Sequence, residues 1–102
     1  MAGFEYNFEW DPRKAAINLT KHGLSFETAA TVFQDASALS MFDEKHSATE
    51  ERWITLGLDN QGQLVVVCHT WRENQRGEAS CRIISARKAS RREAAQYKHR
   101  NT

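Results

Sequence analysis

The sequence predicts a single α+β domain, residues 1–102, in which two N-terminal helices pack on an antiparallel sheet of about four strands and a C-terminal helix follows. Three observations predict it. Apolar residues follow helical spacing as far as Phe33 and alternate, as in strands, after it. Residues typical of helix ends flank the segment 12–22. The chain has 102 residues and is 40% hydrophobic, which suffices for one core without disulfides or metal.

The first helix is expected at residues 12–22, after a short strand at residues 8–10. Asp11 can accept hydrogen bonds from the free N–H groups of the first turn, and Pro12 fits that turn because it needs no N–H there. Gly23 can take the left-handed conformation that ends a helix. Capping at both ends therefore defines this helix.

A second helix is expected from residue 26 to residue 33. Ser25 can cap it, and Glu27 lies in its first turn, where a negative charge is favourable. Its apolar face consists of Phe26, Ala29, Ala30 and Phe33.

Strands are expected next at residues 38–42, 52–58, 64–70 and 80–87. The run Val65, Val66 and Val67 is continuously apolar, so its strand should be central and covered on both faces. Residues 72–79 are polar and are expected to form a hairpin loop. Ser90 and Glu93 have capping-box spacing and should begin the last helix.

Composition excludes several classes of protein. The net charge is +1, so any attraction to a polyanion must be local. No apolar window is long enough to span a membrane, and the N-terminus lacks the pattern of a signal peptide, so a cytoplasmic protein with reduced thiols is expected. Cys68 and Cys81 face each other if their hairpin is symmetric; two small buried residues are the alternative. No His or Cys pair has zinc-site spacing and no phosphate loop is present, so neither a metal nor a cofactor is expected.

The loop before the second long strand concentrates chemically useful groups. His46 can move protons near neutral pH and Arg52 can hold phosphate. The alternative is an acidic, solvated loop in which Arg52 pairs with Glu50 or Glu51. His69 can face Arg52 across the hairpin, or can be a hydrogen-bonded histidine of the sheet.

The end of the chain is locally basic. Residues 84–100 contain one acid, Glu93, and six of the 14 Lys and Arg residues: Arg87, Lys88, Arg91, Arg92, Lys98 and Arg100. Binding of a polyanion or an acidic partner is one interpretation, and each phosphate contact would make it salt-dependent. A solvated helix face is the other.

Three segments resemble one known family. "FEWDPRKAAINLTKHGLSFETAATVF", then "EERWITLG" after a histidine, then "RIISARKASRREAAQY" are similar to the BrnT family of bacterial type II toxins, over residues 8–97. The resemblance implies a RelE-like fold and a ribonuclease that inhibits translation. It also implies a cognate antitoxin, BrnA, which neutralises the toxin, assembles with it as two copies of each protein, and supplies the only link to DNA.

The resemblance also implies roles for individual residues. Arg52, Arg82 and Arg87 would hold phosphate, His46 would transfer protons, and Ser85 would orient one of these groups. Further RNA contacts would come from Lys88, Arg91, Arg92 and Tyr97, the last by stacking on a base or else by packing its helix. Lys21 and His22 match the family pattern too, but would mainly close the first helix. A non-catalytic module that binds RNA or the antitoxin, and acts with it in autoregulation, is the alternative.

Overall fold

The computed structural model describes residues 5–101, with side chains from Asn7 onward. Its elements, in chain order, are β1 (Glu5–Glu9), α1 (Pro12–His22), α2 (Phe26–Ala30), the 3₁₀ turn η1 (Thr31–Gln34), β2 (Leu39–Phe42), the 3₁₀ turn η2 (Glu44–His46), β3 (Arg52–Leu58), β4 (Leu64–Thr70), β5 (Arg72–Glu73), β6 (Glu78–Lys88) and α3 (Arg91–Arg100). The predicted α+β class is confirmed.

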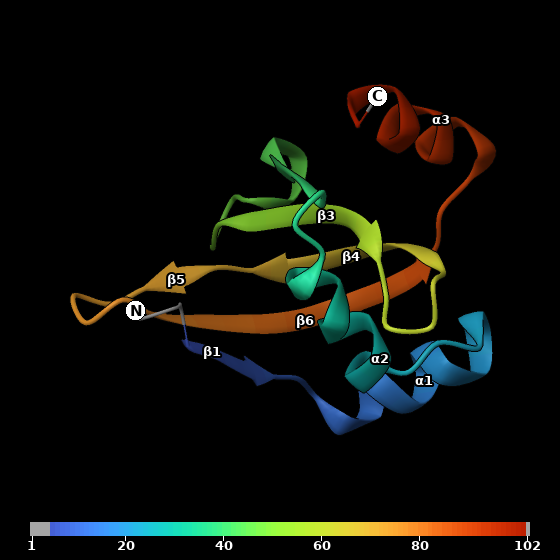
Figure 1. Ribbon diagram of the computed structural model, residues 1–102. Helices are drawn as coiled ribbons and strands as arrows, with labels where there is room; N and C mark the ends of the chain where they lie inside the picture. Colours follow the sequence, from blue (N-terminus) through green and yellow to red (C-terminus); the bar gives the residue numbers. More distant parts are fainter. Residues whose placement is uncertain (1–4, 102) are drawn as a thin grey trace.

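The sheet differs from the prediction in strand number and direction. It has six strands in the order β1-β6-β4-β3-β2, with β5 also paired to β6. All described pairs are antiparallel except β1 and β6, which are parallel. Both strands lead into a helix at the same end of the sheet, so both must run towards that end (Figure 1). The prediction of an antiparallel sheet of about four strands was therefore wrong for the pairing of β1 with β6. It also missed β5, which lies in the segment expected to be a loop.

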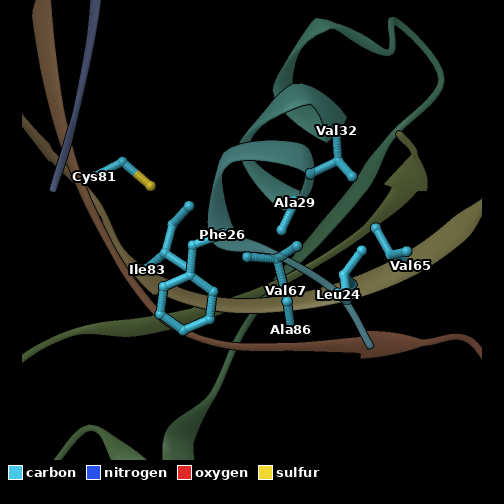
Figure 2. Close-up of a cluster of buried hydrophobic side chains, with 9 residues drawn as sticks. All are labelled: Leu24, Phe26, Ala29, Val32, Val65, Val67, Cys81, Ile83 and Ala86. Carbon is cyan, nitrogen blue, oxygen red and sulfur yellow. The ribbon is translucent and has the colours of Figure 1, made fainter. Parts of the chain in front are cut away.

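The core lies between the sheet and the short helices after α1. β4 is the middle strand, and Val65, Val66 and Val67 are all buried, as predicted for a strand covered on both faces. Figure 2 shows Ala29 and Val32 of α2 and η1 above Val67 and Val65 of β4, with the ring of Phe26 beside Ile83 of β6. One face of the sheet is therefore covered by α2 and η1.

The predicted helix ends are confirmed. Asp11 accepts the N–H of Arg13 at 2.8 Å, and Gly23 has a φ of 67° at the end of α1. Ser25 accepts the N–H of Thr28 at 3.1 Å, and Ser90 with Glu93 forms a complete capping box.

The second helix is shorter than expected. α2 ends at Ala30, and the chain continues as the 3₁₀ turn η1. The Thr31 hydroxyl donates to the carbonyl of Thr28 at 2.6 Å, which supports a tighter turn there. Val32, instead of Ala30, consequently takes the fully buried position.

A buried amide that the sequence did not single out ties α1 to β6. Asn18 donates from Nδ2 to the carbonyls of Leu24 at 3.0 Å and Ala86 at 2.9 Å, and its Oδ1 accepts the Ala86 N–H at 3.1 Å. β1 pairs with β6 only as far as Arg82. Asn18 therefore continues, with a side chain, the hydrogen bonding of β6 beyond the end of β1.

Cys68 and Cys81 do not face each other across strands, which was one of the two alternatives left open by the sequence. Cys68 is opposite Ser85, and Cys81 pairs with Phe8 of β1. A register shift between Cys68 and His69, together with the β5 pairing, removes the assumed symmetry of the hairpin. Both thiols are free, and burial raises the pKa of Cys81 to about 12, which makes it an inert core residue.

Candidate functional site

Four of the predicted site residues lie on one face of the sheet. Side chains alternate along a strand, and Val67, Ile83 and Ala86 point into the core. The registers of β3, β4 and β6 therefore place Arg52, Arg82, Ser85 and Arg87 on the opposite face, the one that α2 and η1 leave uncovered.

Glu50 joins two of these arginines. Its Oε1 accepts a hydrogen bond from Nη2 of Arg82 and lies 3.7 Å from Nη2 of Arg52. Arg52 and Arg82 come from β3 and β6, with β4 between them, so the sheet itself brings them together. We call Glu50, Arg52 and Arg82 the arginine cluster.

Glu50 and Arg82 of this cluster line a cleft of about 810 Å³, which we call the arginine cleft. β1, the segment before β3, the end of β4, β5 and β6 form its walls, and the lining carries four glutamates beside Arg72 and Arg82. The Nε–H of Arg52 is buried and has no hydrogen-bond partner among the described residues, which is uncommon.

Hydrogen bonds attach the segment that carries His46 to the start of β3. The Asp43 N–H donates to the Arg52 carbonyl at 2.8 Å, and the Arg52 N–H donates to Oγ of Ser47 at 3.0 Å. The His46 side chain is exposed, and its Nδ1 lies 2.8 Å from Oδ2 of Asp43. A carboxylate that holds one ring nitrogen orients the imidazole and leaves the other nitrogen for solvent or substrate.

Arg87 lies at the other end of the sheet and is held by α3. Its Nη1 and Nη2 donate to the two carboxylate oxygens of Glu93 at 2.7 and 2.9 Å. The paired charge holds the pKa of Glu93 at about 2 and raises the pKa of Arg87. Arg87 follows Arg82 by five positions along β6, or roughly 16 Å at the rise of a strand.

The remaining basic residues follow Arg87. Lys88, Arg91 and Arg92 are exposed at the end of β6 and in the first turn of α3. With Lys98 and Arg100, also exposed on α3, they form what we call the α3 cluster.

Tyr97 fixes α3 to the body of the domain. Its hydroxyl donates to Oδ2 of Asp35 at 2.7 Å, and Leu58 N–H donates to the same oxygen at 2.9 Å. Burial alone would raise the pKa of Asp35, but the hydrogen bonds from Leu58, Tyr97 and Ser37 hold this pKa below its usual value. The structure therefore gives Tyr97 a packing role, one of the two that the sequence left open.

His69 does not face Arg52, because the register pairs it with Trp53. It is buried in the sheet, where Nε2 lies 2.6 Å from the Thr55 hydroxyl and Nδ1 lies 2.9 Å from the Thr70 carbonyl. The alternative of a hydrogen-bonded sheet histidine is thus the correct one.

The structure unites some predicted site residues and separates others. Arg52 and Arg82 meet at Glu50, and His46 is on a segment bound to Arg52. Ser85 lies one row further along the sheet, opposite Cys68, and Arg87 belongs with the α3 cluster. Lys21 and His22 lie in the last turn of α1, as expected for residues that close it.

Glu50 is the residue whose importance the sequence did not reveal. It was considered only as a neutralising partner of Arg52. Its stronger contact is with Arg82, 32 positions away, and no local spacing indicates that.

Two further findings concern residues 5–101. No group of three His, Cys, Asp or Glu side chains among them is arranged to hold a metal ion. None of their helices is long and apolar enough to cross a membrane.

Fold and site together define the class of protein. It is a small α+β domain whose mixed sheet packs short helices on one face and presents paired arginines on the other. The family model described as the ribonuclease toxin BrnT of type II toxin–antitoxin systems matches residues 10–93. The chain belongs to this BrnT family.

One solved structure supports the fold. The crystal structure of the Brucella abortus ribonuclease toxin BrnT is similar to this chain with a TM-score of 0.61 and 24% sequence identity. The similarity covers 85% of this chain and 99% of the other. No curated protein matches the chain.

Proposed function

We propose that this chain is a metal-independent endoribonuclease whose reaction takes place at the arginine cluster. The observation that carries the proposal is the meeting of Arg52, Arg82 and Glu50 on the uncovered face of the sheet. Two guanidinium groups from different strands can contact one phosphate, and a planar fork suits phosphate oxygens. In the free chain, Glu50 supplies the negative charge that a phosphate would bring.

The reaction follows from RNA carrying its own nucleophile. The 2′-oxygen attacks the neighbouring phosphorus, the bond from phosphorus to the 5′-oxygen breaks, and a 2′,3′-cyclic phosphate and a 5′-hydroxyl result. Arg52 and Arg82 stabilise the extra negative charge of the pentacoordinate phosphorus. Glu50 accepts the proton of the 2′-hydroxyl, and His46, oriented by Asp43, donates a proton to the leaving 5′-oxygen.

The α3 cluster and Arg87 would hold the RNA backbone beyond the scissile phosphate. Lys88, Arg91 and Arg92 are exposed and lie on the same stretch of chain as Arg87. Ser85, between the two groups on β6, would contact the connecting nucleotide. Each phosphate that they neutralise adds to the salt dependence of binding.

The type II family implies an antitoxin, and we propose a BrnA-like protein that covers this basic surface in an assembly of two copies of each chain. The toxin would then act in the cytoplasm by inhibiting translation, and DNA would be bound only through the antitoxin.

A second function deserves a test because the arginine cleft has mixed charge. Its lining carries four glutamates, and Arg82 and Arg87 are each paired with a carboxylate. Such a surface suits a protein segment of mixed charge, so the chain would serve as a non-catalytic module that binds its antitoxin.

Incubation of the purified chain with single-stranded RNA at increasing salt separates the two functions. The ribonuclease proposal expects the RNA to be cut, with a rate that falls as salt rises. Intact RNA at low salt, together with tight binding of the product of the neighbouring gene, would favour the binding module.

A further inference from the structure

The outer edge of β2 is exposed and has no partner strand among the described residues. β2 is the last strand in the sheet order, next to β3. Ser40, Met41 and Phe42 are exposed, and the two apolar side chains leave 59% and 42% of their surface in solvent. Natural proteins usually protect such an edge with charged residues or proline, and β2 contains neither. An uncharged edge of this kind is a template for a further strand.

The pairing of β2 with β3 determines which backbone groups point away from the sheet. The Asp43 N–H donates to the Arg52 carbonyl at 2.8 Å, so these two opposite residues form a hydrogen-bonded pair. Such pairs recur at every second residue of an antiparallel ladder, so Met41 also directs its backbone groups towards β3. Ser40 and Phe42 therefore direct their N–H and C=O groups outward.

These outward groups are spaced to pair with the same strand of a second copy. In an antiparallel pair centred on Met41, Ser40 of each copy lies opposite Phe42 of the other. Opposite residues of this type exchange two backbone hydrogen bonds. The charged residues 43–45 of one copy then lie opposite the uncharged residues 37–39 of the other, so no like charges meet. The edge of β2 is thus complementary to itself.

A pocket on each copy lies where the Phe42 ring of the other would point. It has a volume of about 370 Å³, and its lining includes Phe33, Ser40 and Trp53. Phe42 lies on the same face of the sheet, because its ring contacts Trp53 edge-on at 5.4 Å. Side chains of opposite residues project to one face, so Phe42 of the second copy lies beside Ser40. The small Ser40 side chain leaves room for the ring to reach the pocket.

We infer that two copies of this chain pair through β2 into one continuous sheet, with Phe42 of each copy in the pocket of the other. The contact uses the same residues on both copies, as in the common two-fold dimers. Its axis is perpendicular to the sheet, so both arginine clusters open on the same side of the dimer. The inference does not depend on the ribonuclease function.

Sedimentation velocity of the full chain, from micromolar to millimolar concentration, tests the association. The patch is small, so a dimer that dissociates on dilution is expected. Phe42→Ala should weaken dimerisation by roughly 10- to 100-fold, because two rings lose their pocket. Phe42→Pro also removes an outward N–H and should abolish the dimer, since edge strands tolerate proline at such positions. Ile17→Ala, at an exposed apolar residue of α1, is the matched control and should dimerise normally.

Cross-linking tests the register. Met41 would lie opposite itself in a pair without hydrogen bonds, where Cβ atoms are about 4.5–5.5 Å apart. Met41→Cys should therefore form a disulfide between two copies under mild oxidation, seen on a non-reducing gel. Leu39→Cys is on the same face of the same strand but would lie opposite Asp43, so it should not cross-link. The unmodified chain, with free Cys68 and Cys81, gives the background.

Three outcomes would overturn the inference in variants with native circular dichroism. They are a monomer at every concentration, equal association of Phe42→Ala and the unmodified chain, and equal cross-linking of the two cysteine variants. A monomer would leave the edge of β2 to an extended segment of another protein. Concentration-dependent dimers that Met41→Cys alone cross-links would support the inference, even in a chain that cuts no RNA.

Discussion

At the scale of single residues, we propose that the arginine cluster carries the chemistry. Sequence analysis identified Arg52 from the loop that precedes its strand and Arg82 through a family resemblance, whereas Glu50 became significant only when the sheet brought it to Arg82. Side-chain partners 32 positions apart depend on strand order, and strand order is not encoded in local spacing. For Glu93 the sequence predicted only the capping box with Ser90, and its ion pair with Arg87 appeared with the structure.

Replacement of either arginine tests the assignment. Arg82→Ala and Arg52→Ala should each lower the rate of RNA cleavage on the order of 10²-fold, as for removal of one preorganised donor to a developing oxyanion. Single-turnover cleavage by variants with native circular dichroism measures this. Arg76→Ala, on the exposed tip of the β5–β6 hairpin, is the matched control and should cleave normally. Equal rates for all three variants would contradict the site.

At the scale of elements, the predictions succeeded where the signal was local. α1 begins and ends at the residues that its caps indicated, and β3 and β4 match residues 52–58 and 64–70. The failures were non-local: the parallel pairing of β1, the short strand β5 and the use of Asn18 as a partner for β6. Each depends on what lies opposite the residue in space.

Asn18 should be essential to the junction of α1 and β6. Asn18→Ala removes three hydrogen bonds and leaves buried backbone groups of Ala86 without partners, which should lower the free energy of unfolding by about 3 kcal/mol. Urea denaturation measures the change. The control is Asn60→Ala in the exposed β3–β4 turn, expected to be nearly neutral. A similarly small effect for Asn18 would show that water replaces its side chain.

The junction of β6 and α3 should depend on pH. The pKa of Glu93 is about 2 when folded, against an ordinary value of 4.5, so ionised Glu93 stabilises the fold above pH 4.5 and this contribution disappears as the pH falls towards 2. Glu93→Gln preserves the capping box. It should lower the free energy of unfolding by about 1 kcal/mol at neutral pH, a value reduced for solvent screening of the half-exposed pair.

Urea denaturation of wild type and Glu93→Gln across this range provides the check, with Glu27→Gln in the first turn of α2 as the control. The difference between wild type and Glu93→Gln should shrink steadily below pH 4.5. A difference that is independent of pH would mean that the ion pair with Arg87 contributes nothing to stability.

At the scale of the whole molecule, the sheet separates two basic regions. The arginine cluster lies where β3 begins, and the α3 cluster lies at the opposite end, where β6 leads into α3 (Figure 1). The sequence showed a basic stretch at residues 84–100 and placed Arg82 and Arg87 on one strand. An extended strand distributes those residues over roughly 16 Å, which suits a single-stranded polyanion that runs along the sheet.

Cleavage of a defined RNA with a single 2′-O-methyl group at the scissile nucleotide tests the central claim most directly. The account predicts that the unmodified RNA is cut to a 2′,3′-cyclic phosphate and a 5′-hydroxyl in the presence of EDTA, and that the methylated RNA stays intact at that position. Cleavage of the methylated RNA, or loss of all activity in EDTA, would contradict attack by the 2′-hydroxyl at a metal-independent arginine cluster.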